Sequence, residues 1–166
     1  ILILDVWNPY VTTSLNKRFA MLLATWFGSG LIKLAPGTWG SLAALPFAWI
    51  IYENWRAPGL ALATLAVFLI GIYVSQIYAR DRENEDPSEV VIDEVAGMCF
   101  TLLVVPTDIF YYFIGFILFR IVDIWKPWPV SWADKNIKGG VGIMLDDILA
   151  GVYAALALLT VRIVFN

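Results

Sequence analysis

The stretch GLALATLAVFLIGIYVSQIYA, residues 59–79, decides the class of fold, because it contains no charged residue. An α-helix rises 1.5 Å per residue, so about 20 apolar residues cross the roughly 30 Å hydrocarbon core of a bilayer. The stretch has this length and is bounded by Arg56 on one side and by Arg80 on the other. It therefore predicts a helix that spans a membrane.

The composition of the whole chain agrees with this prediction. Its 166 residues are 60% hydrophobic and 15% charged, whereas soluble domains carry about 45–50% apolar and about 25% charged residues. The single cysteine, Cys99, excludes an intrachain disulfide. The absence of histidine excludes Ser-His-Asp hydrolysis, phosphohistidine intermediates and histidine-ligated zinc.

Further apolar segments lie on both sides of the first one, and residues 14–26 have the spacing of a helix in the membrane interface. These segments are residues 39–52, 95–105, 109–125 and 143–165. The sequence thus predicts an all-α, polytopic membrane helical bundle with about four or five apolar helices and an interfacial N-terminal helix. Residues 14–166 are expected to form a single membrane-embedded domain, and residues 1–13 are left unassigned.

The basic residues indicate the orientation of this bundle. If the apolar segments alternate across the bilayer, most Lys and Arg residues fall on one side, which marks that side as cytoplasmic. This larger group is Lys17, Arg18, Lys33, Arg80, Arg82, Arg120, Lys126, Lys135 and Lys138, and the smaller group is Arg56 and Arg162. The same topology places three polar clusters, residues 28–41, 81–94 and 120–147, at the cytoplasmic boundary.

Two of these clusters contain adjacent carboxylates, Asp93-Glu94 and Asp146-Asp147, each expected to open a helix. A helix cap favoured by the macrodipole is the simplest explanation of one carboxylate in each pair. It does not explain the second, because adjacent residues point about 100° apart on a helix. Oxygen ligands without histidine suit Mg²⁺. We expect at least two of five carboxylates to bind this ion: Asp146 and Asp147 first, then Asp123 and Glu94, and Asp93.

Arg120 and Asp123 share a helix face, because they are three residues apart. A structural ion pair is one explanation of this spacing. The other is that Arg120 and Lys126 bind phosphate oxygens while Asp123 binds metal or orients water. The glycine-rich loop 28–41 ends at a helix N-terminus, which Thr38 is expected to cap and where backbone N–H groups attract anions. Its predicted substrate-binding residues are Gly37, Thr38, Gly40 and Ser41.

Carboxylates and cations beside lipid favour metal-assisted phosphate chemistry on a lipid. The predicted catalytic residues are Asp123, Asp146, Asp147, Glu94 and Lys126. Two other classes stay open: a CDP-alcohol phosphotransferase, whose Asp-x2-Asp-Gly-x2-Ala-Arg pattern is missing, and a non-enzymatic membrane protein that binds or transports ions. The sequence has no basic patch typical of nucleic-acid binding, and no protein partner is evident.

The polar clusters also resemble a known family, phosphatidylglycerophosphatase A. The resemblance lies in residues 27–30 and 35–41 (FGSG and APGTWGS), 92–98 (IDEVAGM), 119–129 (FRIVDIWKPWP) and 139–151 (GGVGIMLDDILAG). It implies a Mg²⁺-dependent, multi-pass phosphatase of the bacterial inner membrane, with its active site facing the cytoplasm. The implied reaction removes the terminal phosphate of phosphatidylglycerophosphate. We expect direct attack by water oriented by Asp123, and an aspartyl-phosphate intermediate is the competing route.

Overall fold

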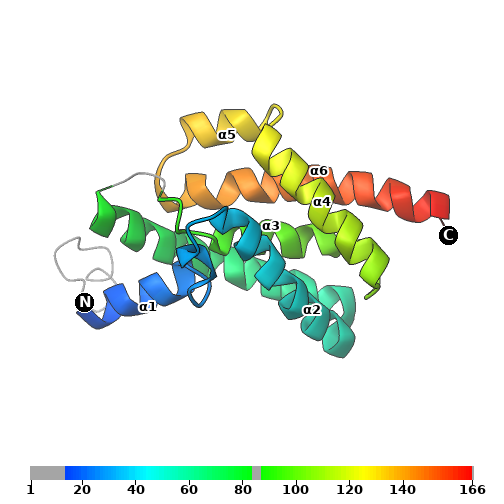
Figure 1. Ribbon diagram of the computed structural model, residues 1–166, viewed down its shortest axis with the longest axis horizontal. Helices are drawn as coiled ribbons and strands as arrows, with labels where there is room; N and C mark the ends of the chain where they lie inside the picture. Colours follow the sequence, from blue (N-terminus) through cyan, green and yellow to red (C-terminus); the bar gives the residue numbers. More distant parts are fainter. Residues whose placement is uncertain (1–13, 84–86, 166) are drawn as a thin grey trace.

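The computed structural model describes residues 14–83 and 87–165, and these residues form helices without any strand (Figure 1). The prediction of an all-α fold is therefore confirmed, while the unassigned residues 1–13 lie outside the described part. The helices are α1 (Ser14–Ala24), the short 3₁₀ helix η2 (Ser29–Leu31), α2 (Pro36–Arg82), α3 (Ile92–Leu102), α4 (Ile109–Trp125), α5 (Val130–Asn136) and α6 (Gly139–Phe165).

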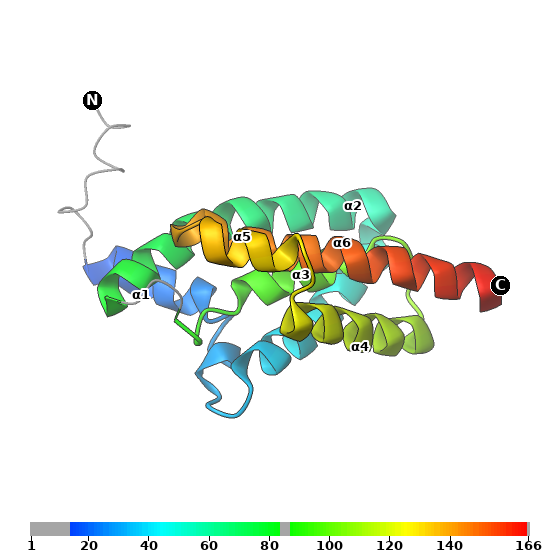
Figure 2. The ribbon, with the colours of Figure 1, turned by 90° about the horizontal axis from the view of Figure 1, so that it is seen from above.

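Helix α2 bends back on itself at Arg56, so two of the predicted apolar segments belong to one helix. Arg56 has φ 55° and ψ −162°, which is not helical. Pro58 follows two residues later and has no N–H group to continue the helical hydrogen bonds. The two limbs of α2 therefore run in opposite directions, and its start and end lie away from the bend (Figures 1 and 2).

Two helices in the described ranges are long and apolar enough to cross a membrane, residues 36–81 of α2 and 139–165 of α6. The prediction of four or five such helices is wrong here. Residues 39–52 and 59–79 form the two limbs of α2 on either side of the bend at Arg56, and they are counted together as one long helix. Two further predicted segments are short, because α3 has 11 residues and α4 has 17, whereas about 20 are needed to span the hydrocarbon core.

The helix starts also differ from the predicted ones. Helix α6 begins at Gly139, so Asp146 and Asp147 lie in its third turn, and a helix cap does not account for either of them. Helix α2 begins at Pro36 after Ala35, so Thr38 lies inside the first turn and is not the cap. Proline suits the first position of a helix because the N–H it lacks has no partner there.

Glycines bring α3 and α6 unusually close together. A Cβ atom at Gly97 would lie 2.5 Å from the carbonyl oxygen of Asp147, and one at Gly151 would lie 2.6 Å from the carbonyl oxygen of Gly97. The two backbones thus touch where any larger residue would push them apart. Small residues allow this kind of close helix contact inside membranes.

Side chains around this contact form the core, and apolar side chains also cover much of the outside. Phe119, Met98 and Leu158 are fully buried. Many large apolar side chains of α2, α4 and α6 are exposed, which is typical of a surface that faces lipid. Helix α1 packs on α2 and is tied to its end by the ion pair between Lys17 and Asp81.

We expect Gly97→Ala to destabilise the protein by about 1–3 kcal/mol, because the added methyl group meets backbone atoms that cannot move away without separating α3 from α6. Gly115→Ala is the control, because its Cβ would lie 3.1 Å from Cδ2 of Leu158, the end of a flexible side chain. The measurement is equilibrium unfolding in detergent. Equal losses of stability in both variants would contradict the role of Gly97.

Candidate functional site

A polar cavity of about 310 Å³ lies where the start of α2, the start of α3, the end of α4, α5 and the first turns of α6 meet. Charged residues from four of these segments and from the loop before α6 line it. They are Asp93, Glu94, Arg120, Asp123, Lys126, Asp134, Lys138, Asp146 and Asp147. All five carboxylates that the sequence predicted as metal ligands are among them.

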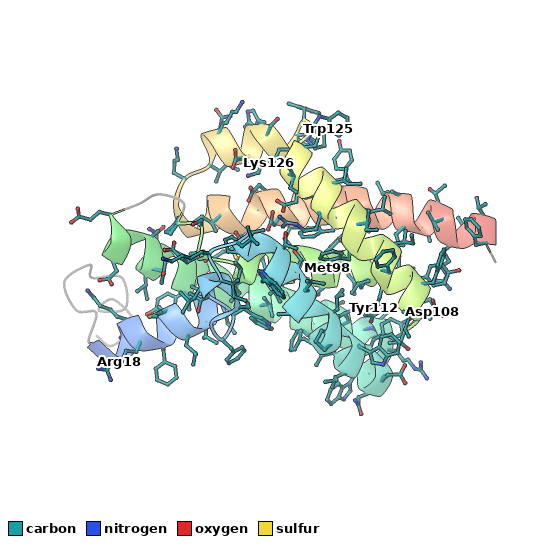
Figure 3. All side chains as sticks on the ribbon, viewed as in Figure 1. Arg18, Met98, Asp108, Tyr112, Trp125 and Lys126 are labelled. Atoms are coloured by element: carbon teal, nitrogen blue, oxygen red, sulfur yellow. The ribbon has the colours of Figure 1, made fainter. Side chains whose placement is uncertain are left out.

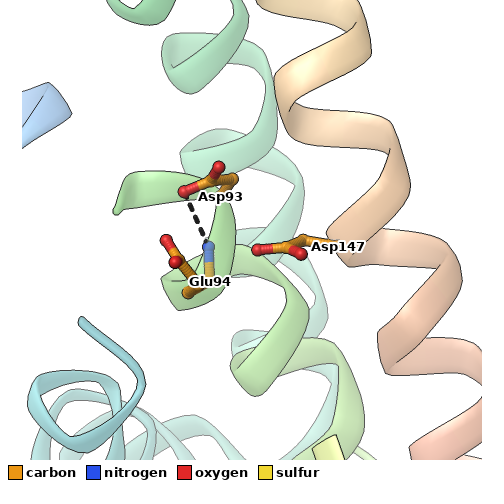
Figure 4. Close-up of side chains that lie close together, drawn as sticks. All are labelled: Asp93, Glu94 and Asp147. Carbon is orange, nitrogen blue, oxygen red and sulfur yellow. Dashed lines mark hydrogen bonds between the residues drawn. The ribbon is translucent and has the colours of Figure 1, made fainter. Parts of the chain in front are cut away.

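Three of the carboxylates form a tight cluster, Asp93 and Glu94 in the first turn of α3 and Asp147 on the facing side of α6 (Figure 4). One oxygen from each residue lies within 4.8 Å of the others. Asp93 Oδ1 also accepts a hydrogen bond of 3.0 Å from the Glu94 backbone N–H, which fixes the start of the helix. The cluster is adjacent to the contact at Gly97, which comes one turn later in α3.

The environment of this cluster disfavours negative charge unless a cation is present. Asp93 is 9% exposed and Asp147 3%. Burial, followed by the neighbouring charge of Glu94, raises the pKa of Asp93 well above its usual range, and burial raises the pKa of Glu94 to about 8. Glu94 Oε2 is buried and has no hydrogen-bond partner among the described residues. Hard oxygen donors, one of them without a partner, fit a divalent cation such as Mg²⁺.

Arg120 and Asp123 form an ion pair of 2.5 Å on the cavity side of α4. The predicted structural pair is therefore present, and it lies at the cluster, since Arg120 Nη1 is also 4.0 Å from Glu94 Oε1. Gly37 completes this wall, because a Cβ atom there would lie 2.1 Å from Glu94 Oε1. The start of α2 can approach the carboxylates only through a residue without a side chain.

Lys126 joins a second pair of carboxylates in the cavity, Asp134 and Asp146. Its Nζ donates hydrogen bonds of 2.5 Å to Asp134 Oδ1 and of 2.7 Å to Asp146 Oδ2. Partial burial lowers the pKa of Lys126, but the hydrogen bonds to the two carboxylates outweigh this and raise it. Lys126 follows α4 with φ 46°, a left-handed conformation that closes the helix. Adjacent Asp146 and Asp147 thus have different partners.

Only one of the four predicted substrate-binding residues in the glycine-rich loop lines the cavity. Gly37 lines the cavity, whereas Thr38, Gly40 and Ser41 are not part of its lining. Ser41 is buried and donates a hydrogen bond of 2.8 Å to the Gly37 carbonyl oxygen. A Cβ atom at Gly40 would lie 2.6 Å from Cβ of Val91, so this glycine allows the packing of α2 on the start of α3.

Two cavity residues were missed by the sequence analysis, Asp134 and Lys138. Asp134 lies in α5, between the predicted apolar segments 109–125 and 143–165, and its eight-residue separation from Lys126 gives no periodic signal. Lys138 was counted only as a cytoplasmic charge. Its position directly before Gly139-Gly140, in the same polar cluster as Asp146 and Asp147, was the signal that could have marked it as a cavity residue.

Comparisons with known proteins agree on one family. A family model described as Phosphatidylglycerophosphatase A matches residues 22–162. Phosphatidylglycerophosphatase A of Escherichia coli K12 is 45% identical over 136 residues, which cover 81% of this chain and 78% of that protein. The protein of the same name from Haemophilus influenzae Rd is 37% identical over 156 residues, 93% of this chain and 95% of that protein.

A third relative carries a different name. A Bacteroides thetaiotaomicron protein, provisionally named a phosphatidylinositol-3-phosphatase, is 41% identical over 149 residues, which cover 86% of this chain and 92% of that protein. No solved structure matches the chain.

We expect Lys126→Met to lower the free energy of unfolding by about 1–3 kcal/mol, because it leaves the buried Asp146 carboxylate without its charged donor. The control is Lys17→Met, which removes the exposed pair with Asp81 and should cost about 0–1 kcal/mol. Thermal or denaturant unfolding in detergent measures both losses. A Lys126 variant as stable as the Lys17 variant would show that the hydrogen bond to Asp146 contributes nothing to folding.

Proposed function

We infer the chemistry of the cavity from one premise: this chain belongs to the phosphatidylglycerophosphatase A family. Its reaction is the hydrolysis of the terminal phosphomonoester of phosphatidylglycerophosphate, which gives phosphatidylglycerol and inorganic phosphate. The structural observation that carries the mechanism is the cluster of three carboxylates in a cavity that is also lined by Arg120 and Lys126.

We assign the carboxylate cluster of Asp93, Glu94 and Asp147 as the Mg²⁺ site. The support is the spacing of their oxygens, their burial and the unpaired Oε2 of Glu94. When bound there, Mg²⁺ supplies positive charge that offsets the charge of the phosphate and polarises the phosphoryl group. Asp146 and Asp123 face the same cavity but already pair with Lys126 and Arg120. We therefore assign them roles other than metal binding.

Two of the cations that line the cavity, Arg120 and Lys126, bind the phosphoryl oxygens. Arg120 presents a guanidinium held in place by Asp123, and such a planar group matches phosphate geometry. Lys126 presents an ammonium group between Asp134 and Asp146. Because Lys126 has three donors and two are used, it can bind a phosphate oxygen without losing either carboxylate. The backbone at Gly37 adds the positive end of the α2 dipole.

Asp123 orients the attacking water and accepts its proton. It lies on α4 next to the carboxylate cluster, where it interacts electrostatically with Glu94 and Asp147. The hydrogen bond from Arg120 to its Oδ2 holds this carboxylate in place beside the cluster. A positioned carboxylate is a suitable general base for this step. Asp146 then acts indirectly, because it holds Lys126 at the place where phosphate binds.

We propose that this cavity faces the cytoplasm from the bacterial inner membrane. The support is the charge distribution, since Arg18 and Lys126 lie away from the end of the molecule that carries Asp108 (Figure 3). At that end Arg162 donates a hydrogen bond of 2.5 Å to the Val104 carbonyl oxygen after α3. An excess of Lys and Arg marks the cytoplasmic side of membrane proteins.

Phosphate release from defined lipids tests the function. The purified protein with Mg²⁺ should release phosphate from phosphatidylglycerophosphate, and more slowly or not at all from phosphatidylinositol 3-phosphate. The matched inactive control is Asp147→Asn. Preference for the inositol lipid would favour the activity named for the Bacteroides relative. Release of CMP from CDP-diacylglycerol and an alcohol would instead identify a phosphotransferase.

The metal assignment makes a separate prediction. Glu94→Gln and Asp147→Asn should each weaken Mg²⁺ binding by about tenfold or more, because each removes a charged oxygen ligand. Asp81→Asn is the control, because this carboxylate lies outside the cavity and pairs with Lys17. Calorimetric titration of the purified protein with Mg²⁺ measures the affinity without turnover. Unchanged affinity in both cluster variants would reject the assignment.

A further inference from the structure

A shallow, open apolar groove of about 600 Å³ lies on the outside of α4 and shares Arg120 with the charged cavity. Its lining residues are Phe116, Ile117, Arg120, Ile121, Ile124 and Trp125. The isoleucines recur at intervals of four and three residues, so they form one stripe of the helix. Phe119 and Asp123 are buried on another face, and α4 therefore separates an apolar outer surface from the reacting groups.

Arg120 connects the two sites, because it lines both the groove and the cavity. Its Nη1 atom contacts Asp123 and approaches Glu94 on the cavity side. Its Nε atom is buried and has no hydrogen-bond partner among the described residues. An N–H group without a partner costs free energy, so a polar group that reached Nε would stabilise this position of the side chain.

The terminal phosphate, the phosphodiester and the acyl chains follow one another along the substrate, as the charged cavity, Arg120 and the apolar groove do along the protein. The terminal phosphate fits the charged cavity, but the acyl chains cannot enter there, because burying apolar groups among charges separates those charges from their partners. The phosphodiester between the head group and the diacylglycerol falls between the two parts. A lipid whose phosphate lies at the carboxylate cluster must leave the cavity past one wall, and Arg120 is the wall residue that also lines an apolar groove.

We propose that the α4 groove is the acyl-chain subsite of this enzyme, with Arg120 Nε donating a hydrogen bond to the phosphodiester at its entrance. The proposal rests on the proposed function. It assigns Ile117, Ile121, Ile124 and Trp125 a role in substrate binding that other lipid-facing residues do not have. The groove holds the acyl chain next to the glycerol and so sets the depth to which the head group enters the cavity.

Matched substitutions separate a subsite from ordinary lipid contact. Ile124 in the groove and Ile163 near the end of α6 are both 72% exposed, so serine at either position has a similar cost in detergent. We expect Ile124→Ser to raise the KM for long-chain phosphatidylglycerophosphate by about three- to tenfold through lost apolar contact, with kcat nearly unchanged. Ile163→Ser should leave both constants unchanged, and neither variant should differ from the parent protein with a water-soluble, short-chain substrate.

Photocrosslinking tests the same subsite without a substitution. The probe is a non-hydrolysable phosphatidylglycerophosphate analogue with a diazirine on the acyl chain near the glycerol. Its crosslinks should map to residues 116–125 and should disappear when unlabelled substrate competes. Crosslinks spread over α2 and α6 that resist competition would reject the subsite, even if Ile124→Ser fails to fold.

The outcomes also distinguish a failure of the subsite proposal from a failure of the proposed function. Phosphate release by the parent protein, combined with equal KM values for the Ile124 and Ile163 variants, would reject the groove and leave the function intact. A parent protein that releases no phosphate from either the long-chain or the short-chain lipid would reject the proposed function and the subsite together.

Discussion

The backbone contact between α3 and α6 is the constraint on which the rest of the site depends. Gly97 and Gly151 allow the two helices to touch, and this contact brings the first turn of α3 opposite the third turn of α6. Asp93 and Glu94 then meet Asp147 at the wall of the polar cavity. Buried carboxylates repel one another and lose hydration, so the packing energy of the glycine contact holds together groups that electrostatics would separate.

Local sequence patterns predicted the helical class and most helix positions, because apolar runs and their polar ends are local signals. They did not predict how the runs connect. The interval between the predicted segments 39–52 and 59–79 contains the bend of α2 at Arg56, but the two apolar runs do not show how the chain connects them. The start of α6 was missed for a related reason. The last apolar segment was predicted to begin at residue 143, which left Gly139, Gly140 and Gly142 outside it, whereas in the structure Gly140 lets α6 pack against the backbone of Ile72.

The site was predictable where chemistry alone selects residues. Carboxylates and cations in an apolar chain stand out, and all the predicted acidic residues do line one cavity. The sequence did not predict which side chain each carboxylate would contact. Asp146 and Asp147 are neighbours in the sequence, yet one faces Lys126 and the other the α3 carboxylates, because a helix turns by about 100° per residue. Asp134 was missed because its pairing with Lys126 depends on a helix, α5, that has only seven residues.

The left-handed backbone of Lys126 sets two contributions to stability against each other at a single residue. Glycine is the usual residue where a helix closes in this conformation, since a side chain there costs about 1–2 kcal/mol. The chain nevertheless has lysine, whose ammonium group reaches Asp134 and Asp146 inside the polar cavity. Glycine would relax the end of α4, but it would also leave the buried Asp146 carboxylate without its charged donor, a loss of about 1–3 kcal/mol. The common stabilising exchange of a left-handed residue for glycine therefore offers no gain in thermal tolerance at this position.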